Sequence, residues 1–298
     1  MIYPRPLKQG DSVAIVSPAS KIDAKLVDGA CATLEAWGFR PVVGSCCKGE
    51  CGSFSGTVGQ RLGDLRAALE NPDVRAVLCS RGGYGVVQMI EHFRDSMWNN
   101  DPKWLIGFSD ISALHAVSVH AGVVSVHASM CKLLTEHPDC QCSHTLHDIL
   151  TGKLPDYEVA GDERNREGNV SGTVTGGNLA VLSGLISTPY DLLKKDHILF
   201  IEDISEAIYR VERMLYTLRL NGTLARTKAL IVGQFTDYKP SIDHQCMYDM
   251  IEKMVADYDF PVAYNFPVGH VDYNLPILEG AQADLTVTKD KVRLTFKR

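Results

Sequence analysis

Short apolar runs alternate with helical patterns through the first half of the chain. The runs are rich in β-branched residues and predict strands at Ser12–Ser17, Pro41–Gly44, Arg75–Ser80, Trp104–Ser109 and Val123–Ala128. The segments between them predict helices at Asp23–Gly38, Gln60–Asn71, Val86–Trp98 and Asp110–Ala121. Strands that alternate with helices form a parallel sheet covered on both faces, and nearly continuous apolar strands fit that position. The sequence therefore predicts an α/β fold.

A different pattern follows a polar stretch. Glu136–Gly168 is charged and lacks a long apolar period, so we expect a connecting region with a domain boundary near residue 160. A length of 298 residues also fits two domains, here 1–160 and 161–298. The elements predicted for the second part are a strand at Ile198–Glu202, a helix at Glu206–Leu220 capped by Ser205, a strand at Ala229–Gln234, a helix around His244–Tyr258 and a hairpin of Ala283–Thr288 with Lys291–Phe296.

Charge and hydropathy exclude several classes of protein. The chain has 30 basic and 36 acidic residues, a balance that disfavours nucleic acid as a partner. No run approaches the roughly 18 to 20 apolar residues of a membrane helix, so we expect no membrane partner. The apolar run Val13–Val16 is shorter than the roughly 7 to 15 residues of a secretory signal. We therefore expect a cytoplasmic protein.

Cysteines and histidines form two local clusters. The nine cysteines are an odd number, which favours reduced thiols over a disulfide framework. Neither cluster has the paired C-x-x-C spacing of a structural zinc site, so we expect no metal and no other cofactor. The clusters are Cys46, Cys47 and Cys51, and Cys140, Cys142, His144 and His147.

Ser109 stands where an apolar strand is predicted to turn into a helix. Such a turn lifts a serine hydroxyl out of the sheet, and the free N–H groups of the helix's first turn stabilise a nearby oxyanion. The motif Gly107–Asp110 lacks the second glycine of the Gly-x-Ser-x-Gly elbow of α/β-hydrolases. The alternative is that Ser109 and Asp110 only cap a helix.

A glycine cluster, Arg81–Gly85, follows the predicted strand Arg75–Ser80. Glycines at the carboxyl end of a parallel strand allow a ligand to approach the backbone. The Gly-x-Gly-x-x-Gly order is absent, and no Lys-Ser/Thr pair follows. A phosphate-binding loop, an oxyanion or substrate cradle and a tight turn all remain open.

An acidic pair and a loop histidine complete the candidates. Glu202 and Asp203 follow an apolar strand, with Glu206 just beyond, and an acid there either orients a histidine or interacts with a helix dipole. His270 lies in a loop bounded by proline and glycine, and His127 is a second candidate. Ser109, Glu202 and His270 would form a triad in the order Ser, acid, His, which unrelated hydrolases also share.

Several of these motifs occur together, in one order, and the chain thereby resembles the LD-carboxypeptidase family of serine peptidases. That family also includes the microcin C self-immunity peptidases. The resemblance covers nearly the whole chain, although His127-Ala128-Ser129 and Ile208 depart from the family's usual residues. The shared motifs are Gly10–Pro18, Arg81–Gly85, Gly107–Asp110, Thr175–Leu179, Glu202–Asp203, Tyr209–Arg210, Arg213–Leu215 and Gly269–His270.

The resemblance implies a flavodoxin-like domain at 1–160 that carries the nucleophile, and a swivelling β/α domain at 161–298 that carries acid and base. It implies that Ser109 is the nucleophile, Glu202 the acid and His270 the base. It also implies a homodimer. The further residues expected at the oxyanion and substrate positions are the backbone N–H of Asp110 and of Gly82 or Gly83, together with Arg81, Tyr84 and Asn178.

Three functions follow as expectations. The first is a cytoplasmic carboxypeptidase that removes the terminal D-alanine from murein tetrapeptide during cell-wall recycling. The second is a microcin-immunity-type peptidase acting on peptidyl or aminoacyl nucleotides, which would need an aromatic platform for the base. The connecting region offers only Tyr157 for that purpose. The third is a non-catalytic module that binds a small anion on the Gly82–Gly85 backbone.

Overall fold

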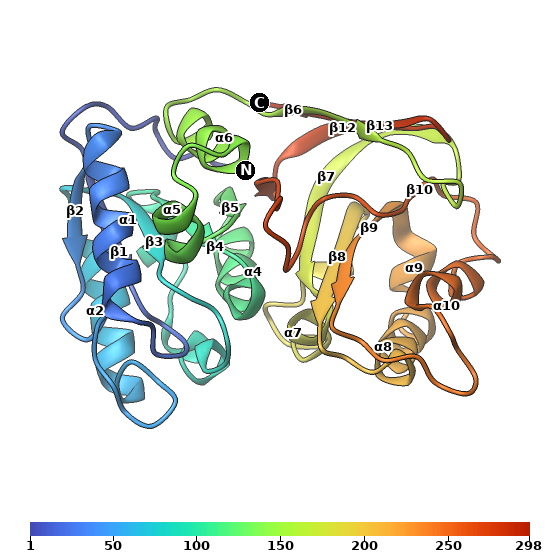
Figure 1. The fold of residues 1–298 in the computed structure, drawn as a ribbon, viewed down its shortest axis with the longest axis horizontal. Coiled ribbons are helices and arrows are strands. Elements are labelled where there is room, and N and C mark those ends of the chain that lie inside the picture. Colours follow the sequence, from blue (N-terminus) through green and yellow to red (C-terminus); the bar gives the residue numbers. More distant parts are fainter. The chain divides into compact units, whose positions relative to one another are not determined.

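The computed structural model describes residues 1–298 and divides into two compact units (Figure 1). The first unit contains 1–154 and 275–280, and the second contains 155–274 and 281–298. The chain first passes from one unit to the other between Leu154 and Pro155, whereas the sequence pattern predicts the boundary near residue 160. The reason is that strand β6 (Asp156–Ala160) pairs with β13 (Lys291–Lys297) of the second unit.

The first unit is built on a six-stranded sheet in the order β11-β5-β4-β3-β1-β2. Strands β1 to β5 run parallel, in the 2-1-3-4-5 order of flavodoxin-like folds, and β11 is antiparallel to β5. The predicted α/β class is confirmed. The strands are β1 (Ser12–Val16), β2 (Arg40–Val43), β3 (Val74–Cys79), β4 (Trp104–Gly107), β5 (Ser125–His127) and β11 (Ile277–Glu279).

Helices cover both faces of this sheet. Because β1 lies between β2 and β3, right-handed connections place α1 (Ala24–Ala36) and α2 (Val58–Glu70) on opposite faces. Accordingly, α1 packs against α5 (Cys131–Glu136), whereas α2 packs against α3 (Ser96–Asn99). A capping box of Thr57 and Gln60 begins α2. The remaining helices are α4 (Ser112–His120) and α6 (Gln141–Leu150).

One prediction for this part of the chain is wrong. The predicted helix Val86–Trp98 is instead two 3₁₀ turns, Val86–Gln88 and Ile90–His92, followed by α3. Phe93 turns into an extended conformation, which brings its ring within 5.7 Å of the Trp98 ring and buries both, and this packing ends the helical path. The polar stretch predicted to be a connecting region contains α6 and β6.

The second unit has a seven-stranded sheet in the order β10-β9-β8-β7-β12-β13-β6. The half from β10 to β7 is parallel, and the half from β7 to β6 is antiparallel. The predicted terminal hairpin is confirmed as β12 and β13. The strands not yet given are β7 (Gly168–Asn178), β8 (His197–Ile204), β9 (Thr227–Thr236), β10 (Val262–Ala263) and β12 (Gln282–Val287).

One apolar core supports the parallel half of this sheet. Leu199 and Ile201 of β8 pack with Val211 and Leu215, which lie on one face of α8 (Ile208–Leu220). Helix α8 begins after Ala207 without a side-chain cap, so Ser205 does not cap it as expected. None of the helices combines the length and the apolar composition that a membrane span requires. The other helices are α7 (Leu179–Ser183), α9 (Thr223–Arg226) and α10 (Met247–Met254).

Candidate active site

Ser109 occupies a strained turn at the carboxyl end of β4. Its φ is +66°, in the left-handed region that residues other than glycine seldom adopt. A 3₁₀ turn from Ser109 to Ile111 then leads into α4. Because this backbone carries the strand sharply into the helix, the turn resembles a nucleophile elbow, although Ile111 stands where the second glycine of that motif would be.

The glycine loop after β3 lies directly against this serine. A Cβ atom on Gly82 would be 2.8 Å from Ser109 Cβ and 3.1 Å from its Oγ. Gly83 has a φ of +113°, and a side chain there would overlap Ser20. The fold therefore brings together the predicted nucleophile and the predicted glycine pair, at an approach that only a residue without a side chain permits.

Asp110 turns its side chain toward the glycine loop rather than toward α4. Its carboxylate is buried, and Oδ2 accepts the N–H of Val86 at 3.0 Å. Burial raises the pKa of Asp110 to about 6, and the hydrogen bond from Val86 and the nearby charge of Arg61 partly offset that shift. Helix α4 begins without a side-chain cap, so this contact is the main structural role of the Asp110 carboxylate.

Arg81 and Tyr84 lie on the outer side of the loop. Arg81 donates to the carbonyl oxygen of Lys21 at 3.1 Å. The Tyr84 side chain is exposed, with its ring centroid 6.2 Å from that of Phe54. Their predicted substrate roles stay predictions.

An acid and a histidine pair in the second unit. His270 Nδ1 lies 2.7 Å from Glu202 Oε2, and Glu202 is completely buried at the end of β8. Gly269, with a φ of +132°, makes the approach possible, because a Cβ there would lie 3.0 Å from Glu202 Cβ. A carboxylate only accepts, so His270 donates through Nδ1, which leaves Nε2 as the basic nitrogen of the neutral ring.

The two other candidate acids have different partners. Successive side chains of a strand point to opposite faces, so Asp203 points away from the face that Glu202 occupies. Asp203 accepts from Asn178 Nδ2 at 2.8 Å and from the Ala180 N–H at 2.9 Å. Burial raises the pKa of Asp203 to about 6. The half-buried Glu206 pairs with the exposed Arg210 at 3.6 Å.

Asn178, the last residue of β7, bonds through its side chain to Asp203 of β8 and caps the start of α7. Its Nδ2 binds Asp203, and its Oδ1 accepts the Val181 N–H at 3.1 Å. These contacts give the residue a structural role at the end of β7. The expected substrate role of Asn178 stays a prediction.

Sequence reasoning missed two residues that hold the histidine loop. Gln234, at the end of β9, donates through its backbone N–H to Val268 O at 2.8 Å and through Nε2 to Asn265 Oδ1 at 2.8 Å. The buried Asn274 accepts the Gly269 N–H through Oδ1 at 2.9 Å. A glutamine that ends an apolar strand was a visible signal, whereas nothing in the sequence pattern marks Asn274.

The remaining candidates are His127 and the cysteines. His127 is buried in the first unit, with its ring 6.1 Å from His115 and 5.9 Å from Phe108. All nine cysteines are free, and burial raises the pKa values of Cys46 and Cys47 to about 11. No group of three or more His, Cys, Asp or Glu side chains is arranged to hold a metal ion.

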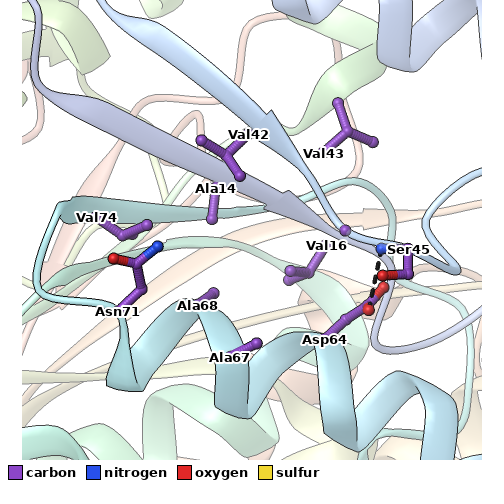
Figure 2. A pocket seen from close by; sticks show the side chains of 11 residues that line it. Ala14, Val16, Val42, Val43, Ser45, Asp64, Ala67, Ala68, Asn71 and Val74 are labelled. Carbon is purple, nitrogen blue, oxygen red and sulfur yellow. Dashed lines mark hydrogen bonds between the residues drawn. The ribbon is translucent and has the colours of Figure 1, made fainter.

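A separate hollow lies between β1, β2 and α2 (Figure 2). Its volume is about 170 Å³, and valines and alanines form most of its wall. Its one carboxylate, Asp64, is occupied by the N–H groups of Ser45 and Cys46. None of the predicted site residues lines it, so we assign it no part in catalysis.

The two-unit α/β fold, the strained serine and the histidine bound to a buried acid define a hydrolase of the serine type. Two family models match the chain. The LD-carboxypeptidase N-terminal domain matches residues 13–128, and the LD-carboxypeptidase C-terminal domain matches residues 171–285. The chain belongs to the LD-carboxypeptidase family, which confirms the resemblance seen in its motifs.

Individual relatives agree with this family. A probable murein peptide carboxypeptidase of Bacillus subtilis is 30% identical over 96% of this chain and 92% of its own length. The crystal structure of a muramoyltetrapeptide carboxypeptidase from Oxalobacter formigenes has a TM-score of 0.88 and 26% identity, covering 96% of this chain and 99% of that one. The structure of MccF in complex with glutamyl sulfamoyl guanosine has a TM-score of 0.87 over 98% of both chains, at 21% identity. The likeness to MccF therefore concerns the fold.

Proposed function

We propose that this protein is a serine carboxypeptidase that removes the terminal D-alanine from murein tetrapeptide during cell-wall recycling. The observation that carries the serine mechanism is the bond of 2.7 Å between His270 Nδ1 and the buried Glu202. The choice of substrate rests on the relatives from Bacillus subtilis and Oxalobacter formigenes, whose names specify murein peptide and muramoyltetrapeptide. The protein needs no metal or other cofactor in this proposal.

In the proposed reaction Ser109 Oγ attacks the carbonyl carbon of the bond that precedes D-alanine. His270 Nε2 takes the serine proton and then gives it to the leaving amine, while Glu202 holds the ring in the required tautomer. Water next attacks the acyl-enzyme, again with His270 as base, and the shortened peptide leaves. Ser109 belongs to the first unit, and Glu202 and His270 belong to the second.

Backbone N–H groups stabilise the tetrahedral intermediate in this proposal. One donor is the N–H of Asp110, and the other belongs to Gly82 or Gly83, whose loop packs against Ser109. We assign Arg81, Tyr84 and Asn178 to the substrate side. Arg81 is the cation nearest in sequence to the glycine pair, and the terminal carboxylate of D-alanine calls for such a partner.

The nucleotide-directed alternative has less support. It needs an aromatic surface for a base, and the one aromatic residue of the connecting region, Tyr157, is buried on β6. The Tyr157 ring lies 6.5 Å from that of Phe266 within the core of the second unit. A module that only binds anions would have no use for the His270–Glu202 pair.

The experiment is a direct comparison of substrates. Purified protein is incubated with murein tetrapeptide, with an aminoacyl sulfamoyl nucleotide, or with neither, and released D-alanine and amino acid are measured by chromatography. We expect D-alanine from the tetrapeptide alone. Release only from the nucleotide would replace this proposal with the alternative.

The nucleophile is tested in the same assay. We expect Ser109→Ala to lower kcat by on the order of 10⁶, because loss of the nucleophile disables the triad as a whole. Circular dichroism and the melting temperature check that the variant is folded. Substantial D-alanine release by folded Ser109→Ala protein would rule out the serine mechanism.

We further propose that the enzyme works in the cytoplasm as a homodimer. Nine free cysteines, five of them buried, suit a reducing compartment. The dimer rests on the family resemblance. Cell fractionation tests the location, and light scattering coupled to size-exclusion chromatography tests the dimer.

A further inference from the structure

One peptide bond of the glycine loop is held between two buried, oppositely charged side chains. The bond joins Gly85 to Val86. Arg61 Nη1 donates to the Gly85 carbonyl oxygen at 3.1 Å, and Asp110 Oδ2 accepts the Val86 N–H at 3.0 Å. A cation on the oxygen and an anion on the N–H of one peptide both align with its dipole.

Arg61 donates all of its hydrogen bonds to backbone carbonyl oxygens and one side-chain amide oxygen. It is 1% exposed, and besides Gly85 it donates to Gly56 O at 3.1 Å, to Pro18 O at 2.5 Å and to Gln88 Oε1 at 2.6 Å. It forms no salt bridge. A buried guanidinium without a carboxylate partner is costly, which indicates a role beyond packing.

The charge of Asp110 partly compensates Arg61 across the peptide. Burial lowers the pKa of Arg61 and raises that of Asp110 to about 6, and the charge of each residue partly offsets the shift in the other. The two side chains and the peptide thus form one electrostatic unit. Gly85 has a φ of +125°, and a Cβ atom there would lie 2.8 Å from Arg61 Nη1. Glycine at this position therefore leaves room for Arg61 to bind the Gly85 carbonyl oxygen.

This unit connects the glycine loop to the serine turn. Asp110 follows Ser109 directly in the chain, and Gly82 contacts Ser109 at the other end of the same loop. The Gly82 carbonyl oxygen also accepts the Ser20 N–H at 3.3 Å. Movement of the Gly85–Val86 peptide would therefore shift Gly82 and Gly83 relative to Ser109.

We propose that Arg61 and Asp110 are positioning residues that clamp the Gly85–Val86 peptide and thereby hold the oxyanion donor of Gly82 or Gly83 at its working distance from Ser109. This inference rests on the proposed serine mechanism. The clamp acts through the side chains of Arg61 and Asp110, which touch no part of the substrate; the backbone N–H of Asp110 is the separate oxyanion donor. Loss of the clamp should therefore affect the transition state much more than substrate binding.

The first experiment compares two buried arginines of the same unit. Arg61→Lys keeps the charge but loses the fork that serves several carbonyls. Arg75→Lys is the matched control, because Arg75 is buried at the start of β3 and binds Asp101, whereas the glycine loop follows the end of that strand. We expect Arg61→Lys to lower kcat by about 10 to 100-fold with KM changed less than about twofold, and Arg75→Lys to leave both constants near wild type.

Melting temperatures of both variants separate stability from positioning. Similar losses of melting temperature with a kcat defect only in Arg61→Lys support the clamp. Equal kcat values in the two variants, or a defect confined to KM, would overturn it. If Arg61→Lys does not fold, Asp110→Asn carries the kinetic test, because it preserves the shape and the backbone N–H and removes only the charge.

The second experiment measures the hydrogen bond between Asp110 and the Val86 N–H without an activity assay. Amide hydrogen exchange is followed at Val86 in wild type and in Asp110→Ala, with Ile106 in the neighbouring β4 as an internal reference. We expect Val86 to exchange at least about tenfold faster in the variant while the Ile106 amide is unchanged. Unchanged exchange at Val86 would overturn the clamp. A wild-type enzyme that releases no D-alanine would instead refute the proposed function, whatever the exchange rates.

Discussion

His270 donates through Nδ1 to Glu202 Oε2 across 2.7 Å, and Gly269 makes that distance possible by carrying no side chain. The acid belongs to a buried strand, so its position is fixed by the sheet. The histidine belongs to a loop that Gln234 and Asn274 hold by hydrogen bonds. A fixed acid and a restrained ring are the arrangement that general base catalysis requires.

We expect Glu202→Gln to lower kcat by about 10⁴ with little change in KM, because the amide no longer selects the tautomer whose Nε2 accepts a proton. Glu206→Gln is the matched control, since Glu206 is half-buried and pairs with Arg210 rather than with a histidine. We expect it to retain wild-type kcat in the D-alanine assay. A larger defect in Glu206→Gln than in Glu202→Gln would transfer the acid role to Glu206.

Gly82→Ala should lower kcat by about 10² or more, because the new Cβ would lie 2.8 Å from Ser109 Cβ and displace the nucleophile. Gly63→Ala is the control. Gly63 is exposed in α2, and a Cβ added there would meet nothing within 4 Å, so alanine should stabilise the helix by about 1 kcal/mol and leave kcat unchanged. Steady-state kinetics and urea unfolding measure the two effects. Normal turnover by Gly82→Ala would show that Ser109 does not depend on this contact.

His197 should make the first residues of β8 sensitive to acid. It is buried, neither ring nitrogen has a hydrogen-bond partner, and burial, with a smaller effect of Arg226, lowers its pKa to about 4. Between about pH 6.5 and pH 4 the unfolded chain therefore binds a proton that the folded chain does not. His197 thus lowers the free energy of unfolding by about 1.4 kcal/mol for each unit that the pH falls within this range.

The variant His197→Phe removes this contribution. Between pH 7 and pH 5 its free energy of unfolding, measured in urea, should fall about 2 kcal/mol less than that of the wild type. Asp110 and Asp203, whose raised pKa values act in the opposite direction, are common to both proteins and cancel in the comparison. Parallel pH profiles for the two proteins would contradict the assignment.

Chelation should leave the proposed activity unchanged, because the proposed nucleophile is a serine hydroxyl and the proposed oxyanion donors are backbone N–H groups. The test is the rate of D-alanine release before and after dialysis against EDTA, with zinc added back to half of the sample. Loss of activity that zinc restores would identify a metal-dependent step.

The sequence pattern predicts the elements with a strong local signal. Strands such as Val74–Cys79 are apolar except for one residue, Arg75, and the terminal hairpin has a clear turn, so both appear where expected. The segment Val86–Trp98 shows the limit of the method. Its apolar spacing fits a helix, but burial of Phe93 against Trp98 is a tertiary preference that no local pattern expresses.

In the candidate site, too, some residues could be predicted from the sequence and others could not. Ser109, Glu202 and His270 are prominent in sequence because each follows a recognisable strand or glycine. Their supporting residues are less visible. Arg61 lies on α2, where it looks like an ordinary surface arginine, and its burial becomes apparent only when β1, α2 and the glycine loop meet. The sequence alone does not distinguish Glu202 from Asp203 as the acid. The two residues have different partners because successive side chains of a strand point to opposite faces.

Strand β11 has a consequence for synthesis on the ribosome. Residues Ile277–Glu279 complete the sheet of the first unit by pairing along β5, yet almost the whole second unit is translated before them. Until they emerge, β5 is an open sheet edge, and such edges pair readily with other chains. An isolated fragment of residues 1–160 would keep that edge permanently. The first unit therefore lacks its sixth strand until Ile277–Glu279 have left the ribosome.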